Sequence, residues 1–247
     1  MSVRRSTDSA SGASALPLWP LPLIAGLLPA IATLIALWLS IRLGLIPTCN
    51  PLVEGCVSVS RAARHDLPNY LFRAMVLPAA ALQAVTWLLA ARWLRDLDHS
   101  AGARSLRALA PLGVIAGIAL ALYGAFLGTE GQVYRWLRQY GTVVYFGFTC
   151  LCMLIAGGGI DRLARSGTLA LAPLLRRALL VLFAMLVALG LGNALSGLWL
   201  DGSAKDRIEN ITEWWGSLIF TFVFVALALI WKGSGVRLAV STDRPAT

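Results

Sequence analysis

Six long apolar segments, with most charged side chains gathered between them, constrain this chain more than any other feature. Only 13% of its 247 residues are Asp, Glu, Lys or Arg, roughly half the share of a soluble domain. A transmembrane helix needs about 20 consecutive, mostly apolar residues. The segments that meet this length are 18–41, 68–94, 106–128, 134–163, 178–200 and 214–231. The sequence therefore predicts an all-α membrane protein, a bundle of six transmembrane helices.

The segments outside these spans are short. Residues 1–16 are polar and rich in Ser and Ala, which predicts a disordered tail. Residues 234–247 form a second predicted tail, and residues 17–233 form one transmembrane domain. The longest connection, residues 42–67, joins the first two spans, so the sequence contains no soluble domain.

The basic residues indicate how the bundle is oriented. An even number of spans puts both termini on one side, and that side holds most of the 21 Lys and Arg residues. The positive-inside rule therefore predicts cytoplasmic termini. Because the net charge of +9 is spread over the ends of the spans, it indicates a membrane surface and no nucleic-acid partner. Heavy use of Arg and Ala is typical of GC-rich bacteria, so we expect the cell membrane of a bacterium, its inner membrane.

The central parts of the predicted spans contain no Asp, Glu, Lys, Arg or His. Ion-coupled transport uses ionisable side chains at that depth, so this class of function is disfavoured. Gln83 and Asn193 are the strongly polar side chains there, and we favour interhelical hydrogen bonds over substrate contacts for both. His65 and His99 fall on opposite predicted faces, so we expect no metal site and no cofactor.

The connection at residues 42–67 carries two cysteines, Cys49 and Cys56. On the predicted topology they face an oxidising compartment, where they can form a disulfide. Closing so small a loop adds about 2 kcal/mol of stability by chain-entropy reasoning. Residues 57–60 alternate apolar and polar side chains, which predicts a short extended piece. We therefore expect a structured outer loop between the first two helices.

Arg73 is the most conspicuous charge near the start of a span. If the second helix begins after Asp66, Arg73 lies about 9 Å further along the axis, at 1.5 Å per residue. At that depth it needs a partner or must reach outward to the headgroups. Glu213, just ahead of the sixth span, is the available acid. It is predicted either to cap that helix, the interpretation slightly favoured, or to pair with Arg73, and the two roles are compatible.

Further Arg and Tyr residues gather on the same predicted face. Arg side chains bind phosphate through paired hydrogen bonds, so such a cluster could hold a lipid phosphate. The alternative is a solvated rim of side chains that reach out of the membrane. The candidate lipid-binding residues are Arg61, Arg64, Tyr70, Arg73, Arg135, Arg138 and Glu213.

A catalytic interpretation of the same loop is weaker. His65 beside Asp66 suggests acid–base chemistry, and Ser60 is a nearby hydroxyl. Neighbours at a helix start rarely face each other, however, and no nucleophile-elbow motif surrounds the serine. We assign no catalytic residue, and a hydrolase or acyltransferase that uses His65 and a serine stays an alternative.

Two stretches resemble signatures of a known family. One runs through Ser58, Ser60, Ala62, Ala63, Pro68, Leu71, Phe72 and Arg73, and the other opens at Glu213 and Trp214. Together with the six-span layout they resemble the FRAG/DRAM/SFK superfamily, which includes the post-GPI-attachment factor and the damage-regulated autophagy modulators. The resemblance implies an accessory role in lipid remodelling, sorting or distribution. By this resemblance the positions that would matter for function are Ser58, Ser60, Pro68, Arg73, Glu213 and Trp214. On this ground Trp214 joins the candidate lipid-binding residues.

We therefore expect a multi-pass membrane protein that binds or handles lipids at the outer leaflet. Its expected partners are membrane lipids, with another membrane protein as a further possibility. A lipid-remodelling enzyme and a purely structural partner of another membrane protein are the alternatives.

Overall fold

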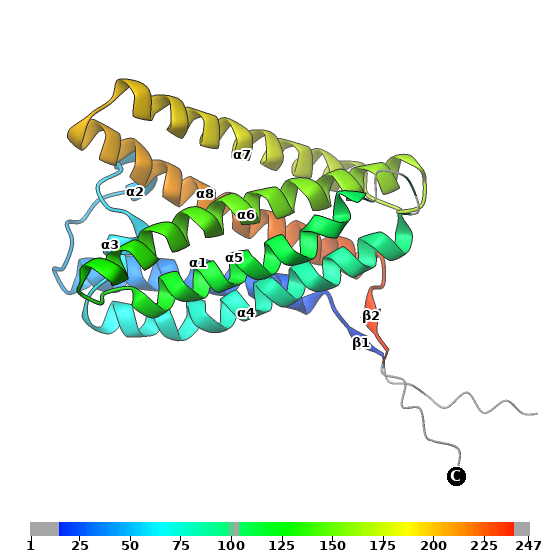
Figure 1. Ribbon diagram of the computed structural model, residues 1–247, viewed down its shortest axis with the longest axis horizontal. Coiled ribbons are helices and arrows are strands. Elements are labelled where there is room, and N and C mark those ends of the chain that lie inside the picture. The colour runs from blue at the N-terminus through cyan, green and yellow to red at the C-terminus, as the bar shows by residue number, and fades with distance from the viewer. Residues whose placement is uncertain (1–14, 99, 101–103, 240–247) are drawn as a thin grey trace, which may run out of the picture.

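The structure, a computed structural model, describes residues 15–98, 100 and 104–239, and its main feature is a bundle of long helices (Figure 1). These helices are α1 (Pro20–Arg42), α4 (Asp66–Leu97), α5 (Leu106–Phe126), α6 (Gln132–Arg165), α7 (Pro173–Trp199) and α8 (Gly202–Gly233). Each is long and apolar enough to cross a membrane. The prediction of an all-α bundle with six candidate spans is thus confirmed.

The short elements lie at the two ends of the bundle. Helices α2 (Pro51–Glu54) and α3 (Val59–Ala62) belong to the connection between α1 and α4, and we call their end of the bundle the loop end. At the other end, the terminal end, β1 (Leu16–Pro17) pairs antiparallel with β2 (Arg237–Leu238). Both ends of the described chain therefore meet on one side of the bundle (Figure 1).

The two predicted tails fall mostly outside the described residues. Of the tail predicted for residues 1–16, residues 1–14 lie outside them, and Leu16 belongs to strand β1. Of the tail predicted for 234–247, residues 240–247 lie outside them, and β2 occupies Arg237–Leu238.

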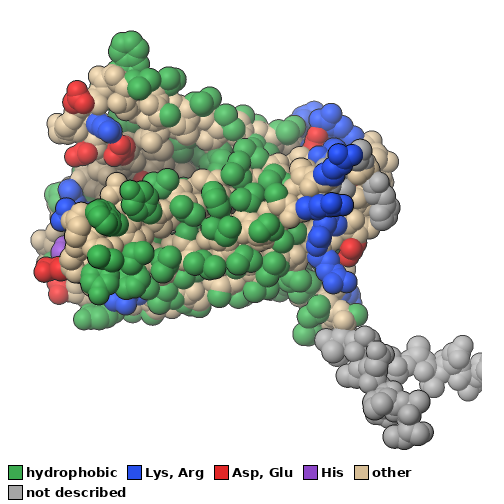
Figure 2. All heavy atoms as spheres, viewed as in Figure 1, with side chains coloured by type: hydrophobic (Ala, Val, Ile, Leu, Met, Phe, Trp, Pro, Cys, Tyr) green, Lys and Arg blue, Asp and Glu red, His purple; other side chains and the backbone are tan. Residues whose placement is uncertain are grey.

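Side chains are sorted along the long axis of the bundle. Figure 2 shows a face that is mostly hydrophobic over its middle, with Lys and Arg gathered in a belt at the terminal end. Acidic and basic side chains share the loop end. An apolar band between two charged ends is the surface that a bilayer requires of a spanning bundle.

Helix α4 lies at the centre of the packing, with α1 on one side and α5 on the other. The helix backbones can approach one another closely because glycines on one helix face large side chains on the next. Gly113 of α5 sits against the Trp87 side chain of α4, and Gly26 of α1 sits against Phe224 of α8. In lipid, where apolar tails do not drive helices together, such close backbone contacts supply the association energy.

The remaining helices leave a gap in the bundle. Helix α6 packs mainly on α5, whereas α7 packs mainly on α8. Helices α6 and α8 diverge toward the loop end (Figure 1), and they meet through side chains such as Phe146 and Phe220, whose ring centroids are 5.3 Å apart. Figure 2 shows the surface hollowed between these two helices at the loop end.

Ion pairs fasten the connections at the terminal end. Asp98, which follows α4, accepts hydrogen bonds from Ser100 and from Arg162 of α6. The bond from Ser100, and then Arg162, holds the pKa of the Asp98 carboxyl below its ordinary value. Asp161 of α6 pairs with Arg176 of α7 at 2.8 Å. These contacts tie α4, α6 and α7 together where they leave the apolar band.

The substitution Gly113→Ala tests the packing of α5 on α4. The added Cβ would lie 2.2 Å from the Cβ of Trp87, so the helices must separate, and overpacking of this kind costs about 1–3 kcal/mol. We expect a lower thermal unfolding temperature in detergent, measured by fluorescence. Gly147→Ala in α6 is the control, because nothing lies within 4 Å of its added Cβ. Equal unfolding temperatures for the two variants would contradict this packing.

Candidate functional site

The loop between α1 and α4 is bound to the first half of α8. Side-chain N–H groups of α8 donate to its backbone carbonyls: Asn210 to Gly55 at 2.8 Å, Trp214 to Val57 at 2.8 Å and Trp215 to Leu52 at 3.1 Å. The backbone N–H groups of Val59 and Ser60 donate in turn to the carboxylate of Glu213. The loop is thus held by donors and an acceptor from one helix face.

The disulfide between Cys49 and Cys56 is present, as predicted. It closes the segment that contains α2, whose first turn is capped by the Asn50 side chain. Gly55 follows with φ +60, and an added Cβ would lie 2.3 Å from the backbone oxygen of Arg207 in α8. Glycine is needed here both for its left-handed backbone and for the close approach to α8.

Residues 57–60 are not the extended piece that their alternation predicts. Ser58 is the N-cap of α3 and accepts from the Arg61 backbone N–H, so Val59 and Ser60 begin a helical turn. The side-chain cap decides in favour of the turn, because a serine hydroxyl satisfies an N–H that a helix start leaves free. The turn also aims the backbone N–H groups of Val59 and Ser60 at Glu213.

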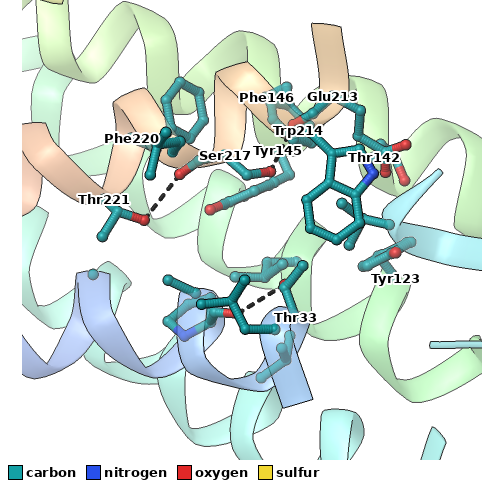
Figure 3. A pocket seen from close by; sticks show the side chains of 18 of the residues that line it. Thr33, Tyr123, Thr142, Tyr145, Phe146, Glu213, Trp214, Ser217, Phe220 and Thr221 are labelled. Carbon is teal, nitrogen blue, oxygen red and sulfur yellow. Dashed lines mark hydrogen bonds between the residues drawn. The ribbon is translucent and has the colours of Figure 1, made fainter. Parts of the chain in front are cut away.

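A cavity of about 140 Å³ opens behind this loop, inside the bundle. Its walls come from α1, α4, α5, α6 and α8, with Leu52 and Val59 of the loop at one end. Figure 3 shows Tyr123, Tyr145, Glu213, Trp214 and Ser217 turned toward it. On the side where α6 and α8 diverge, Thr142 and Phe146 of α6 and Ser217 and Phe220 of α8 line the cavity.

The end of the cavity nearest the loop is polar. Glu213 and Tyr123 both line it there, and Glu213 is half-buried. Tyr123 is only 7% exposed, and its hydroxyl has no hydrogen-bond partner among the described residues. A carboxylate and a phenol thus lie at the polar end of a mostly apolar cavity.

The deep end of the cavity is closed by helix-to-helix contacts. Gln83 of α4 donates to the Ala25 carbonyl of α1 at 3.0 Å and also bonds Tyr145 of α6. The predicted interhelical role of Gln83 is confirmed, whereas no interhelical hydrogen bond of the Asn193 side chain is found among the described residues. Phe220 packs against Tyr145 and Phe146, so the walls here are aromatic.

The structure does not bring Arg73 and Glu213 together. No ion pair of Arg73 is found among the described residues, and the Glu213 carboxylate receives backbone N–H groups instead. Glu213 also does not cap α8, because that helix begins at Gly202, well before it. Both sequence-based roles for Glu213 were wrong, since the loop supplies the donors and the helix starts earlier than its apolar part.

The predicted basic cluster divides into two sets. Arg138 donates to the carbonyls of Phe126 and Thr129 and thereby closes the end of α5. Arg64 is half-buried, and its Nε is enclosed with no hydrogen-bond partner in the part of the chain that the structure describes. The other candidates lie at the surface: Arg61, Tyr70 and Arg135 are exposed, and Arg73 is half-buried. Trp214 lines the cavity and is buried, with only 5% of its surface exposed.

The weak catalytic candidates do not form a catalytic set. His65 and Asp66 are both exposed at the start of α4, and Asp66 has a positive φ of 49 that turns the chain into the helix. The hydroxyl of Ser60 lies 3.1 Å from that of Ser58. No hydrogen bond joins His65 to either serine in the part of the chain that the structure describes. Within that part, no cluster of His, Cys, Asp or Glu could hold a metal ion.

Tyr123 and Thr142 were missed by the sequence interpretation. Both line the polar end of the cavity, yet in the sequence they look like ordinary residues of apolar spans. A signal was available in α5, because Tyr123 is the one hydroxyl-bearing side chain in Leu106–Phe126, which is otherwise apolar after Arg107. It could not be used alone, because tyrosines near span ends are usually interface anchors.

Comparison with protein families, with curated proteins and with solved structures gave no match for this chain.

The substitution Glu213→Ala tests how α8 holds the loop. It leaves the two N–H groups of Val59 and Ser60 without an acceptor, and an unsatisfied buried donor costs about 1–3 kcal/mol. We expect the loop to detach more readily and the Cys49–Cys56 disulfide to be reduced faster by an added thiol, measured by alkylation and mass spectrometry.

Glu209→Ala is the matched control for this experiment, because Glu209 lies on the same helix but is exposed and pairs only loosely with Lys205 at 3.9 Å. Its reduction rate should equal that of the wild type. If the disulfide of the Glu213→Ala variant is also reduced at the wild-type rate, the carboxylate does not hold the loop.

Proposed function

We propose that this protein binds a membrane lipid in the cavity beside Glu213 and acts as an accessory protein that handles lipids at the outer leaflet. The observation that carries this proposal is the form of the cavity. It is polar at one end, where Glu213 and Tyr123 lie, and the rest of its lining is mostly apolar. The hydroxyl groups of Thr33, Ser217 and Thr221 in that part are bonded to carbonyls of their own helices. A long apolar site with a few placed polar groups suits an amphiphile.

The depth of the cavity agrees with a lipid chain. Its lining on α8 runs from Glu213 to Phe224, which is about 16 Å along a helix that rises 1.5 Å per residue. An enclosed apolar cavity of about 150 Å³ accommodates a molecule as large as benzene. The cavity here is similar in volume, so it takes part of one acyl chain, while the rest of the lipid lies in the hollow between α6 and α8.

The loop end is assigned to the outer side on two grounds. The Cys49–Cys56 disulfide requires an oxidising compartment, and the belt of Lys and Arg at the terminal end follows the positive-inside rule. On this topology both termini are cytoplasmic and the polar mouth lies at the outer headgroup level. The membrane proposed is the bacterial inner membrane.

The resemblance to the FRAG/DRAM/SFK superfamily supports an accessory role in lipid remodelling or distribution. Its shared positions include Ser58, which caps α3, and Glu213 and Trp214, which bind the loop and line the cavity. The enzyme alternative gains no support from geometry, since His65 is exposed and outside the cavity lining. A partner-binding scaffold is distinguished from lipid binding by the experiment below.

Filling the cavity tests the proposal. Ala30 of α1 lines it, so Ala30→Phe puts a ring where a chain would lie. The protein is purified in native lipid particles, the particles are washed with detergent, and the retained lipids are identified by mass spectrometry. We expect the wild type to retain one lipid class and the variant to lose most of it.

Ala81→Phe is the control, because Ala81 is exposed on α4 and outside the cavity lining. It adds the same ring without filling the cavity and should retain lipid as the wild type does. Loss of retention in Ala30→Phe alone supports the lipid site. Absence of a selective lipid from the wild type, with a protein that co-purifies instead, would replace the proposal with the scaffold function.

A further inference from the structure

Within the lipid site proposed above, on which this inference rests, we infer that the bound lipid carries a primary ammonium group in its headgroup. The Glu213 carboxylate and the Tyr123 hydroxyl would accept hydrogen bonds from that ammonium at the polar end of the cavity. The proposed function requires only an amphiphile with a chain in the cavity, whereas this inference specifies the chemistry of its headgroup.

The first ground is the charge of the cavity lining. Glu213 is the one Asp, Glu, Lys, Arg or His among the described residues that line the cavity. No Lys or Arg forms an ion pair with it in the part of the chain that the structure describes. A carboxylate beside apolar walls is costly unless donors or a cation accompany it. A ligand with one positive charge would complete this end of the cavity, whereas an anionic group would face a carboxylate.

The Glu213 carboxylate can bond a ligand while it holds the loop. It receives the backbone N–H groups of Val59 and Ser60, and a carboxylate offers about four lone-pair sites. Its side chain is also part of the cavity lining. Glu213 immediately precedes the apolar residues 214–231, so its carboxylate lies at the level of the lipid headgroups.

The second ground is the Tyr123 hydroxyl. It is enclosed, on a side chain that is only 7% exposed, and the described residues provide no hydrogen-bond partner for it. Buried polar groups without a partner are rare in native structures, so this one calls for a ligand. Tyr123 lines the same end of the cavity as Glu213 (Figure 3). Because a phenol oxygen can accept a hydrogen bond, a donor bound between the two side chains would satisfy both.

Aromatic rings add to the attraction for a cation. Besides Tyr123, the cavity lining includes Tyr145, Phe146, Trp214 and Phe220. An ammonium group close to the faces of such rings is attracted by their electron density. Charge and rings together therefore favour an ammonium headgroup over a neutral or an anionic one.

The two acceptors decide between the kinds of ammonium group. A primary ammonium has three N–H donors, enough to bond Glu213 and Tyr123 at once. A quaternary ammonium, as in a choline headgroup, has no N–H and would leave the Tyr123 hydroxyl without a partner. The favoured ligand is therefore a lipid with an aminoalkyl headgroup, such as phosphatidylethanolamine.

The experiment compares phosphatidylethanolamine, phosphatidylcholine and phosphatidylglycerol with identical acyl chains. The full chain is purified in a maltoside detergent and an amine-free phosphate buffer, incubated with an equimolar mixture of the three lipids and purified again. Mass spectrometry then quantifies the retained lipids. We expect about tenfold more phosphatidylethanolamine than either of the others, as hydrogen bonds between charged partners imply. This comparison needs no variant.

Two variants assign the preference to the named acceptors. Glu213→Gln removes the charge but keeps an oxygen that can accept from the loop. It should lower the preference about tenfold, with the Cys49–Cys56 disulfide reduced near the wild-type rate. Tyr123→Phe removes only the hydroxyl and should lower the preference about fivefold. The controls Glu209→Gln and Tyr140→Phe, at exposed positions outside the cavity lining, should keep it.

The outcomes separate this inference from the proposed function. Equal retention of all three lipids, still lost in Ala30→Phe, would overturn the ammonium headgroup and leave the lipid site intact. Phosphatidylcholine retained as well as phosphatidylethanolamine, or a preference for phosphatidylglycerol, would also overturn the primary ammonium. Failure to retain any lipid would overturn both proposals.

A last arm separates a lipid headgroup from a free amine. Ethanolamine is added at millimolar concentration to the protein loaded with phosphatidylethanolamine. Displacement of the lipid would mean that the site takes a free amine and would overturn the inference, whereas no displacement supports a lipid headgroup.

Discussion

The hydrogen bonds between α8 and the loop are the interaction on which the loop end depends. A loop with two four-residue helices satisfies few of its own backbone groups, and near lipid each unsatisfied group is costly. Asn210, Trp214 and Trp215 supply donors to its carbonyls, and Glu213 accepts from its N–H groups. Because these residues project from one helix, α8 must lie under the loop.

This position of α8 has consequences for the rest of the bundle. Helix α8 lies against the loop and α1, with α7 on its other side, while α6 follows α5 away from it. The space between α6 and α8 is then bridged by aromatic rings and not by backbone contact. The cavity results from that divergence. Glu213 therefore serves both structures, holding the loop with its carboxylate and contributing charge to the cavity mouth.

The sequence predicted the helices better than it predicted the partners of individual charged side chains. Arg73 and Glu213 were a reasonable pair, since each is a charge near the same predicted membrane face. The structure gives Glu213 backbone partners, because Ser58 caps a helical turn whose N–H groups point at it. Tyr123 was passed over, because a tyrosine near a span end is usually an interface anchor. Its lack of a hydrogen-bond partner becomes visible only after the helices around it are placed.

The sequence alone determined the number of candidate spans, the all-α class, the Cys49–Cys56 disulfide and the interhelical role of Gln83. These features depend on local composition, on spacing along the chain or on the scarcity of polar groups in lipid. The tertiary structure decided the course of α6 and α8, the cavity between them, and the meeting of Tyr123 and Glu213 in its lining. Those features depend on contacts between residues far apart in the chain, here between α3, α5 and α8, and no local pattern encodes such distances.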